Sequence, residues 1–298
     1  TTAGGNTAVG FNALDANTTG YSNQALGCGA LGANTTGHSN TGIGESALLV
    51  NTEGFKNIAV GNNTLDSNTT GDYNVAVGHL ALGANTTANS NVAIGTESLD
   101  VNTTGADNTA IGTNSLGANT TASNNVAVGS SALIANTTGT TNVAVGRSAL
   151  LNATTGSNNT AIGDYAGSDA VASIGSSSNY IVLGNNNNTN ANIKIDWTVT
   201  SDLRDKMNIE SVPYGLDFVN QITPIKYNFK KSRDNATSHG KARFGFKAQE
   251  ILALEGDNPV LVNNDDEDNL KLTGAYLVPV LVNAIKELKA RIETLENK

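Results

Sequence analysis

A glycine recurs every 17 residues through the N-terminal part of the chain, and this fixed period limits the possible folds most. The glycines stand at positions 10, 27, 44, 61, 78, 95, 112, 129, 146 and 163, with no insertion between copies. Asparagine stands four residues before each of them and leucine four residues after, except in the last copy, which has Gly167. An aliphatic residue directly precedes each glycine. Such a period indicates a stacked array in which each unit buries its apolar face against its neighbours.

Each repeat joins two short apolar segments, "xAVG" and "AL", through turn-forming segments of the "ANTTG" type. Seventeen residues are too few for a pair of helices, whereas β-branched residues between Gly and Asn corners are typical of short strands and turns. The repeat therefore predicts one coil of a β-solenoid, with Asn and Thr stacked in ladders and Ala facing a thin interior. At a strand spacing of about 4.8 Å, the ten predicted coils span about 50 Å. The loss of leucine at Gly167 predicts an end cap or exit.

The composition changes near residue 200. Up to Val199 there are 3 Lys or Arg against 11 Asp or Glu, whereas from Thr200 onward there are 14 against 15. All four prolines also lie in the second part. We therefore expect a mainly β protein with a repeat shaft over residues 1–168, a neck over 169–199 and a small α+β domain over 200–298. In the neck, "NYIVLG" and "NIKIDW" predict two short strands.

Several classes of function are disfavoured by composition. The acidic shaft has too few cations to bind nucleic acid, and no apolar run is long enough to span a membrane. A single cysteine, Cys28, excludes an intrachain disulfide framework. The three histidines stand in unrelated positions, and "DDED" at 265–268 lacks the spacing of a calcium loop, so we expect neither metal nor cofactor. Because Thr1 lies inside a repeat and no signal peptide is visible, we expect a fragment or processed product.

The C-terminal residues, from about 275 to 297, show the heptad spacing of a coiled coil. Apolar residues alternate three and four apart, with Pro279 placed in the first turn, where it is tolerated. Ile at a with Leu at d favours two strands. Together with the apolar stripes of the shaft, this helix predicts an oligomer. The heptad residues are Val278, Leu281, Ile285, Leu288, Ile292 and Leu295.

At the border between the two parts stands "SDLRDK", residues 201–206. Alone, these six residues favour a capped helix start, with Ser201 or Asp202 as the N-cap and the charges in solvent. They also resemble the S-D-x-R-x-K signature of the intramolecular chaperone domain of peptidase family S74, found in phage endosialidases, tail spikes and fibres. Three further stretches resemble that family in the same order: "ITPIKYNF" (222–229), "FGFKAQEI" (244–251) and residues 274–298.

The resemblance implies a domain that trimerises the nascent fibre, guides its folding and then cuts itself off in a single turnover. It implies Ser201 as the nucleophile, Lys206 as the general base and Thr200–Ser201 as the cleaved bond. Asp202 and Arg204 are expected to orient or pair with neighbouring groups. The resemblance also implies a trimer, which we expect in place of the dimer that the short heptads favour. The expected trimerisation residues are Leu281, Ile285, Leu288, Ile292 and Leu295.

The repeats "NVAVG" and "NVAIG" are similar to the head repeats of trimeric autotransporter adhesins and to the shafts of phage tail fibres. We therefore expect a homotrimeric tail fibre or spike fragment of a phage virion that attaches to a host glycan or receptor. The alternative is a trimeric adhesin on a bacterial or viral surface that binds glycans through the shaft, with the C-terminal domain as a trimerisation tag only. The scattered acids of the shaft disfavour a glycan-degrading enzyme.

Overall fold

The computed structural model describes residues 3–169, 173–188, 201–230, 237–257, 259–264, 267 and 270–297. The chain divides into two compact units, Thr1–Asn187 and Asn188–Lys298, and each is described by itself. The first is a β-solenoid, and the second is a small α+β unit that ends in a helix. The predicted fold class is therefore confirmed.

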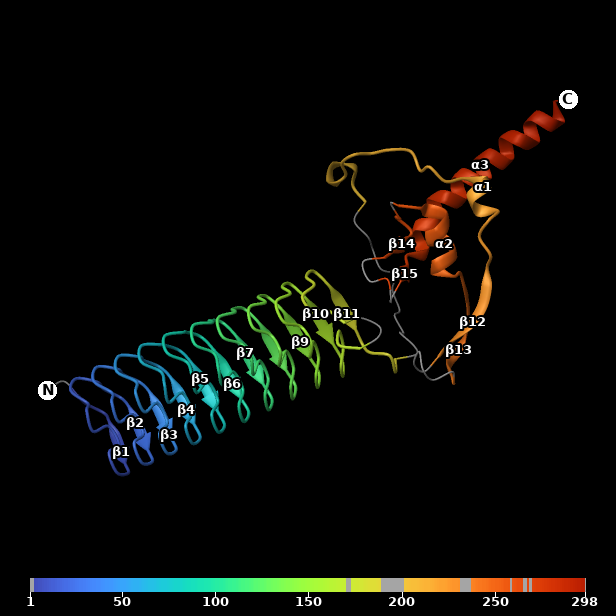
Figure 1. Cartoon of the computed structure of the whole chain (residues 1–298). Helices are drawn as coiled ribbons and strands as arrows, with labels where there is room; N and C mark the ends of the chain where they lie inside the picture. The colour runs from blue at the N-terminus through green and yellow to red at the C-terminus, as the bar shows by residue number, and fades with distance from the viewer. Residues whose placement is uncertain are drawn as a thin grey trace. The chain divides into compact units, whose positions relative to one another are not determined.

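The first unit is one parallel sheet of eleven short strands in sequence order, which appear as successive rungs in Figure 1. Neighbouring strands pair in phase with the repeat, so that Ala8 lies opposite Ala25. Each coil thus contributes one rung, as the sequence predicted. The strands are β1 (Thr7–Val9), β2 (Gln24–Leu26), β3 (Thr41–Ile43), β4 (Ile58–Val60), β5 (Val75–Val77), β6 (Val92–Ile94), β7 (Thr109–Ile111), β8 (Val126–Val128), β9 (Val143–Val145), β10 (Thr160–Ile162) and β11 (Ile181–Leu183).

The recurrent glycine turns the chain out of each strand. Gly27 has a φ of 139°, and a Cβ atom there would lie 2.3 Å from the carbonyl oxygen of Gly44 in the next coil. Both the backbone angle and the close stacking exclude a side chain. Each of these glycines packs directly against the glycine of the next coil, which explains why glycine recurs at this position.

The recurrent leucine fills the interior. Leu31 and its equivalents through Leu150 are fully buried, and so are most of the alanines at the centres of the strands. Leu31 nevertheless has a φ of 51°, in the left-handed region. That conformation costs about 1–2 kcal/mol for a residue with a Cβ, and burial of a leucine side chain contributes about 1.5–3 kcal/mol. Burial thus offsets the strain at every rung.

Two columns of asparagine run through the solenoid beside the leucines, as buried ladders. In the first, the backbone N–H of Asn40 donates to Oδ1 of Asn23 (3.0 Å), and Nδ2 of Asn23 donates to the carbonyl of Gly37 (2.8 Å). In the second, Nδ2 of Asn34 donates to Oδ1 of Asn17 (2.9 Å) and to the same carbonyl of Gly37 (3.0 Å). The predicted asparagine ladders are confirmed, and they satisfy buried polar groups in both directions along the axis.

The stack continues beyond Gly167, where the loss of leucine predicted an end. Strand β11 pairs with β10 at an offset of 21 residues instead of 17, with Thr160 opposite Ile181. Ile174, which is 2% exposed, fills the interior in place of the missing leucine. Its N–H donates to the carbonyl of Gly167 at 3.0 Å. The strand predicted in "NYIVLG" is thus an eleventh rung, and "NIKIDW" lies outside the described residues.

The second unit is built on two hairpins and three helices. The hairpins are β12 (Ile225–Lys230) with β13 (Ser238–Gly245), and β14 (Val262–Asn263) with β15 (Lys271–Leu272); both are antiparallel. The helices are α1 (Leu216–Val219), α2 (Ala248–Glu255) and α3 (Leu277–Glu296), and the 3-10 turns are η1 (Leu203–Asp205) and η2 (Gly274–Tyr276). A core joins the three helices and the β14–β15 hairpin, and its buried residues are Phe218, Ile251, Leu261, Val262, Leu277 and Val280.

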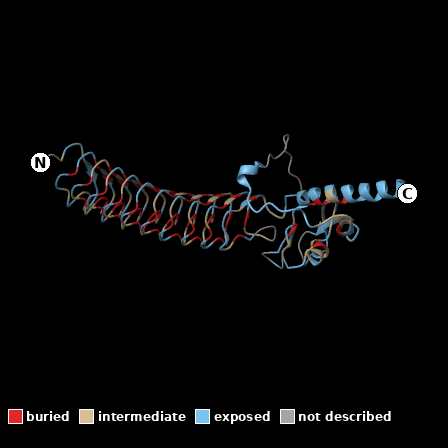
Figure 2. Cartoon of the chain, turned by 90° about the horizontal axis from the view of Figure 1, so that it is seen from above, coloured by how far each residue is buried: buried red, intermediate tan, exposed pale blue. Residues whose placement is uncertain are grey.

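Helix α3 has two apolar faces with different surroundings. Leu277, Val280 and Ala284 are buried. Near the middle of the helix, Oε2 of Glu287 accepts the N–H of Leu216 at 2.8 Å, which fixes α1 against α3. The predicted heptad residues, from Val278 to Leu295, are all exposed in the single chain, and Figure 2 shows the helix as largely exposed. The predicted helix, with Pro279 in its first turn, is confirmed, and its heptad face is available for another helix.

Candidate functional site: the border motif

The border motif folds as one tight turn. Asp202 caps η1, its Oδ1 accepting the backbone N–H of Arg204 at 2.9 Å. The N–H of Lys206 donates to the carbonyl of Leu203 at 3.2 Å, which closes the turn. The capped start expected from the six residues alone is therefore present, with Asp202 as the cap. This turn returns the chain towards Ser201.

The turn brings the predicted nucleophile and base together. Nζ of Lys206 donates a hydrogen bond to Oγ of Ser201 at 2.8 Å. That distance is within the range for a nucleophile and its base. Both residues are exposed. Thr200, the other residue of the predicted cleavage site, lies outside the described residues.

Asp202 and Arg204 pair with each other. Nη2 of Arg204 lies 2.6 Å from Oδ2 of Asp202, and Nε of Arg204 lies 3.1 Å from Oδ1. The hydrogen bonds from the Arg204 side chain and then its backbone lower the pKa of Asp202. The two residues expected to orient or pair with neighbouring groups thus form an ion pair with each other. It holds the turn that carries Ser201 and Lys206, and its side-chain hydrogen bonds join Asp202 only to Arg204.

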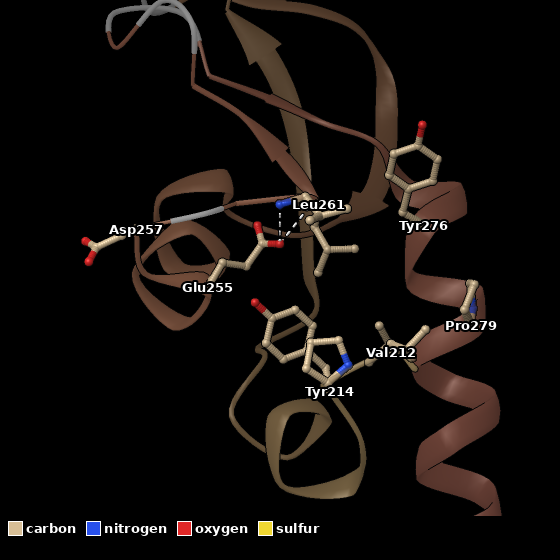
Figure 3. A pocket seen from close by; sticks show the side chains of 10 residues that line it. Val212, Tyr214, Glu255, Asp257, Leu261, Tyr276 and Pro279 are labelled. Atoms are coloured by element: carbon tan, nitrogen blue, oxygen red, sulfur yellow. Dashed lines mark hydrogen bonds between the residues drawn. The ribbon is translucent and has the colours of Figure 1, made fainter. Parts of the chain in front are cut away.

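A pocket of about 710 Å³ lies elsewhere in the second unit, between α2 and α3. Figure 3 shows Tyr214 and Val212 on one side, Tyr276 of η2 and Pro279 of α3 on another, and Glu255 directed towards Leu261. The carboxylate of Glu255 accepts the N–H groups of residues 260, 261 and 262 at 2.7–3.0 Å. Sequence reasoning missed this clamp, because an acid at the end of a helix carries no signal of a partner five residues away. The pocket's lining includes neither Ser201 nor Lys206.

Other kinds of site find little support in the described part of the chain. It contains no group of three or more His, Cys, Asp or Glu that could hold a metal ion. The "DDED" segment lies outside the described residues except for Glu267. Among the described helices, none is long and apolar enough to cross a membrane.

Comparison with known protein families bears on the same segment. Residues 201–260 match the peptidase S74 family, the chaperone of endosialidase. The S74 segment begins at Ser201, and it includes Lys206, both strands of the long hairpin and α2. It stops before α3, so the likeness seen in residues 274–298 lies outside the matched range. The comparisons with curated proteins and with solved structures found no match.

The match of residues 201–260 to the S74 family supports two general statements about function. An S74 chaperone segment follows a β-solenoid shaft in one chain, an arrangement that fits a tail-spike-like protein with an intramolecular chaperone. The peptidase family also implies self-cleavage as a class of activity. The border motif is the part of the S74 segment where the structure places a serine beside a lysine.

Proposed function

We propose that this chain is part of a phage tail fibre or spike, carried on the virion, that attaches to a host glycan or receptor. Residues 200–298 bring three chains together, assist the folding of the shaft, and then release themselves by cutting between Thr200 and Ser201. The observation that carries the proposal is the S74 match, which begins at Ser201, immediately after the solenoid and its neck.

The chemistry of release follows from the pair at the border. The ammonium of Lys206 donates to Oγ of Ser201, so the loss of one proton from Nζ makes the lysine a base beside its nucleophile. Lys206 then takes the proton of the Ser201 hydroxyl as Oγ attacks the carbonyl carbon of Thr200. The peptide C–N bond breaks, and the nitrogen of Ser201 leaves as an amine that takes up a proton. Water hydrolyses the resulting ester, giving a Thr200 carboxylate and a free Ser201 hydroxyl.

We propose that self-cleavage occurs only after the chains have associated. A lysine acts as a base when its ammonium is removed from water, because desolvation disfavours the charged form. Ser201 and Lys206 are both exposed in the single chain. The environment that activates Lys206 must therefore be supplied by association, and cleavage follows assembly.

Exposed apolar surfaces on both units support an oligomer. On α3, Leu281, Ile285, Leu288, Ile292 and Leu295 form an unpartnered heptad stripe in the single chain. On the shaft, the last residue of every strand is aliphatic and points away from the interior, from Val9 to Leu183. Rows of exposed apolar side chains of this kind favour association with another chain. Sedimentation equilibrium of the Ser201→Ala chain tests the state: three chains per particle support the proposal, whereas monomers or dimers contradict it.

Self-cleavage is tested by expressing the chain beside Ser201→Ala and Lys206→Ala and weighing the products by denaturing mass spectrometry. Fragments 1–200 and 201–298 are expected from the parent and from neither variant. Lys241→Ala, which removes an exposed lysine of β13, is the matched control and should cleave like the parent. An intact parent, or cleavage of Ser201→Ala at the same bond, would overturn the proposed reaction.

The chaperone role is tested separately by expressing residues 1–199 alone. The shaft is expected to be insoluble or misassembled without residues 200–298. A soluble, trimeric shaft with β-sheet circular dichroism would show that it folds unaided, and it would leave the C-terminal domain as a trimerisation tag.

A further inference from the structure

Four ring side chains meet on one edge of the shaft, in the turns that precede β2 to β5. The rings of Tyr21 and His38 stack at 4.6 Å with planes 4° apart, and those of His38 and Phe55 at 4.9 Å and 13°. Phe55 and Tyr73 meet edge to face at 5.2 Å and 75°. We call these four residues the aromatic ladder.

The fold of the coil does not require this ladder. The positions equivalent to Tyr21, His38 and Phe55 in the following coils are Asp72, Asn89, Ala106, Ser123 and Thr140, and those coils form the same turn. Their strands also keep the same register. The aromatic side chains are therefore a local feature added to a turn that polar and small residues form equally well.

Tyr73 stands where a large residue is unfavourable. Its φ is 58°, and that of Lys56, one coil earlier in the same column, is 54°. Ser, Asp, Asn and Thr occupy the other non-glycine positions of that column. Tyr73 is 49% exposed, so burial does not offset the strain as it does for the interior leucines. Strained, half-exposed residues of this kind concentrate at ligand-binding sites.

One end of the ladder presents an open ring face. The coil before Tyr21 has Gly4 at the equivalent position, where the carbonyl of Gly4 accepts the N–H of Ser22 at 3.0 Å. A Cβ placed on Gly4 would meet no atom within 4 Å, and Tyr21 is 46% exposed. The face of Tyr21 that does not contact His38 thus has no side chain opposite it at Gly4.

Polar groups lie beside the rings. Nζ of Lys56 lies 4.9 Å from the ring centre of Tyr73 and donates to its hydroxyl at 3.3 Å. Oδ1 of Asp72 accepts the N–H of Phe55 at 2.8 Å, which holds the carboxylate next to the ladder. The open ring face of Tyr21, on a ladder flanked by a cation, a carboxylate and phenol hydroxyls, matches the two surfaces of a sugar. Its C–H groups pack on an electron-rich ring face, and its hydroxyls hydrogen-bond to polar groups.

We propose that the aromatic ladder is a binding site for a linear oligosaccharide. One sugar ring packs on the open face of Tyr21 beside Gly4. The following sugars run along the shaft axis past the ring edges of His38 and Phe55 to the polar groups at Tyr73. Three rung steps of about 4.8 Å give this path a length of about 14 Å. A single-stranded nucleic acid also stacks on aromatic rings, but it needs a positive groove. The chain before residue 200 is instead acidic, with 11 Asp or Glu against 3 Lys or Arg, and it would repel a nucleic acid. This inference rests on the proposed attachment to a host glycan, and it does not depend on the chaperone or on self-cleavage.

Isothermal titration of the full chain tests the proposal with four hexasaccharides: maltohexaose, cellohexaose, chitohexaose and mannohexaose. At least one is expected to bind, and Tyr21→Ala and Tyr73→Ala are expected to weaken that binding at least tenfold. Phe11→Ala is the matched control, because Phe11 is an exposed ring in a different column of the same shaft. It should bind like the parent.

Gly4→Tyr separates binding from packing. The backbone at Gly4 is outside the left-handed region and the space is open, so the new ring extends the ladder and covers the face of Tyr21. The variant is expected to melt at or above the parent's temperature, yet bind the saccharide at least tenfold more weakly. The proposal is overturned if none of the four saccharides binds, if the ladder variants and Gly4→Tyr bind like the parent, or if Phe11→Ala weakens binding equally.

Discussion

The asparagine ladder can be tested at Asn91, in the middle of the shaft. Its Nδ2 donates to the carbonyl of Gly105 at 2.9 Å, and its Oδ1 accepts the backbone N–H of Asn108 at 3.0 Å. Asn91→Ala removes both hydrogen bonds. The carbonyl of Gly105 keeps a second donor, Nδ2 of Asn102 at 2.9 Å, whereas the buried N–H of Asn108 loses its acceptor. The backbone N–H of Asn108 is therefore affected more than the carbonyl of Gly105, which keeps one hydrogen bond.

The expected loss of stability follows from these two effects. One lost hydrogen bond costs about 1 kcal/mol, and a buried N–H left without an acceptor costs about 1–3 kcal/mol. Asn91→Ala should therefore lower the free energy of unfolding by about 2–4 kcal/mol per chain. The measurement is guanidinium unfolding followed by circular dichroism, in the Ser201→Ala background so that all chains have one length.

Thr87→Ala, in the same coil but exposed, is the matched control and should stay within about 0.5 kcal/mol of the parent. If Asn91→Ala also stays within that margin, the ladder does not stabilise the shaft, and the hydrogen-bond reasoning fails.

Three further predictions concern the same coils. Gly95→Ala would place a Cβ 2.6 Å from the carbonyl carbon of Gly112, so we expect the shaft to lose its cooperative thermal transition, as followed by circular dichroism. Leu99→Ala empties a fully buried position and should cost about 2–5 kcal/mol in guanidinium unfolding. Burial raises the pKa of Asp66, so its ionised form opposes folding above that pKa and the opposition fades as the pH falls towards 3.8. Asp66→Asn should therefore raise the melting temperature at pH 7, and a gain equally large at pH 3 would contradict this assignment.

The repeat region was largely predictable because its period leaves few alternatives. The equal spacing of glycine, asparagine and leucine predicted one rung per repeat, an apolar interior and the asparagine ladders. The left-handed backbone at Leu31 was not predictable, because leucine alone rarely adopts it and only burial compensates. The rung formed by β11 was also missed, since the interior residue arrives from Ile174 in a longer turn that no longer follows the period.

The candidate site was predictable in part. Ser201 and Lys206 were named from a family signature, and the turn that brings them together depends on Asp202, whose capping role the six residues also indicated. The aromatic ladder was not found, because its rings lie about one repeat apart in the sequence, Tyr73 stands one position out of phase, and one of the rings is a histidine. The clamp of Glu255 on three backbone N–H groups depends on tertiary placement that no local pattern encodes.

The in-phase register of the coils has a genetic consequence. Because each strand from β1 to β10 pairs with its neighbour at an offset of one repeat, every internal boundary between these coils has the same backbone register. A recombination event between two repeats inserts or deletes a multiple of 17 residues and leaves every remaining boundary intact. Each such event changes the length of the shaft by about 4.8 Å per repeat. The reach of the shaft can therefore vary between generations in fixed steps, whereas an insertion of any other size must be absorbed in a loop, as it is between β10 and β11.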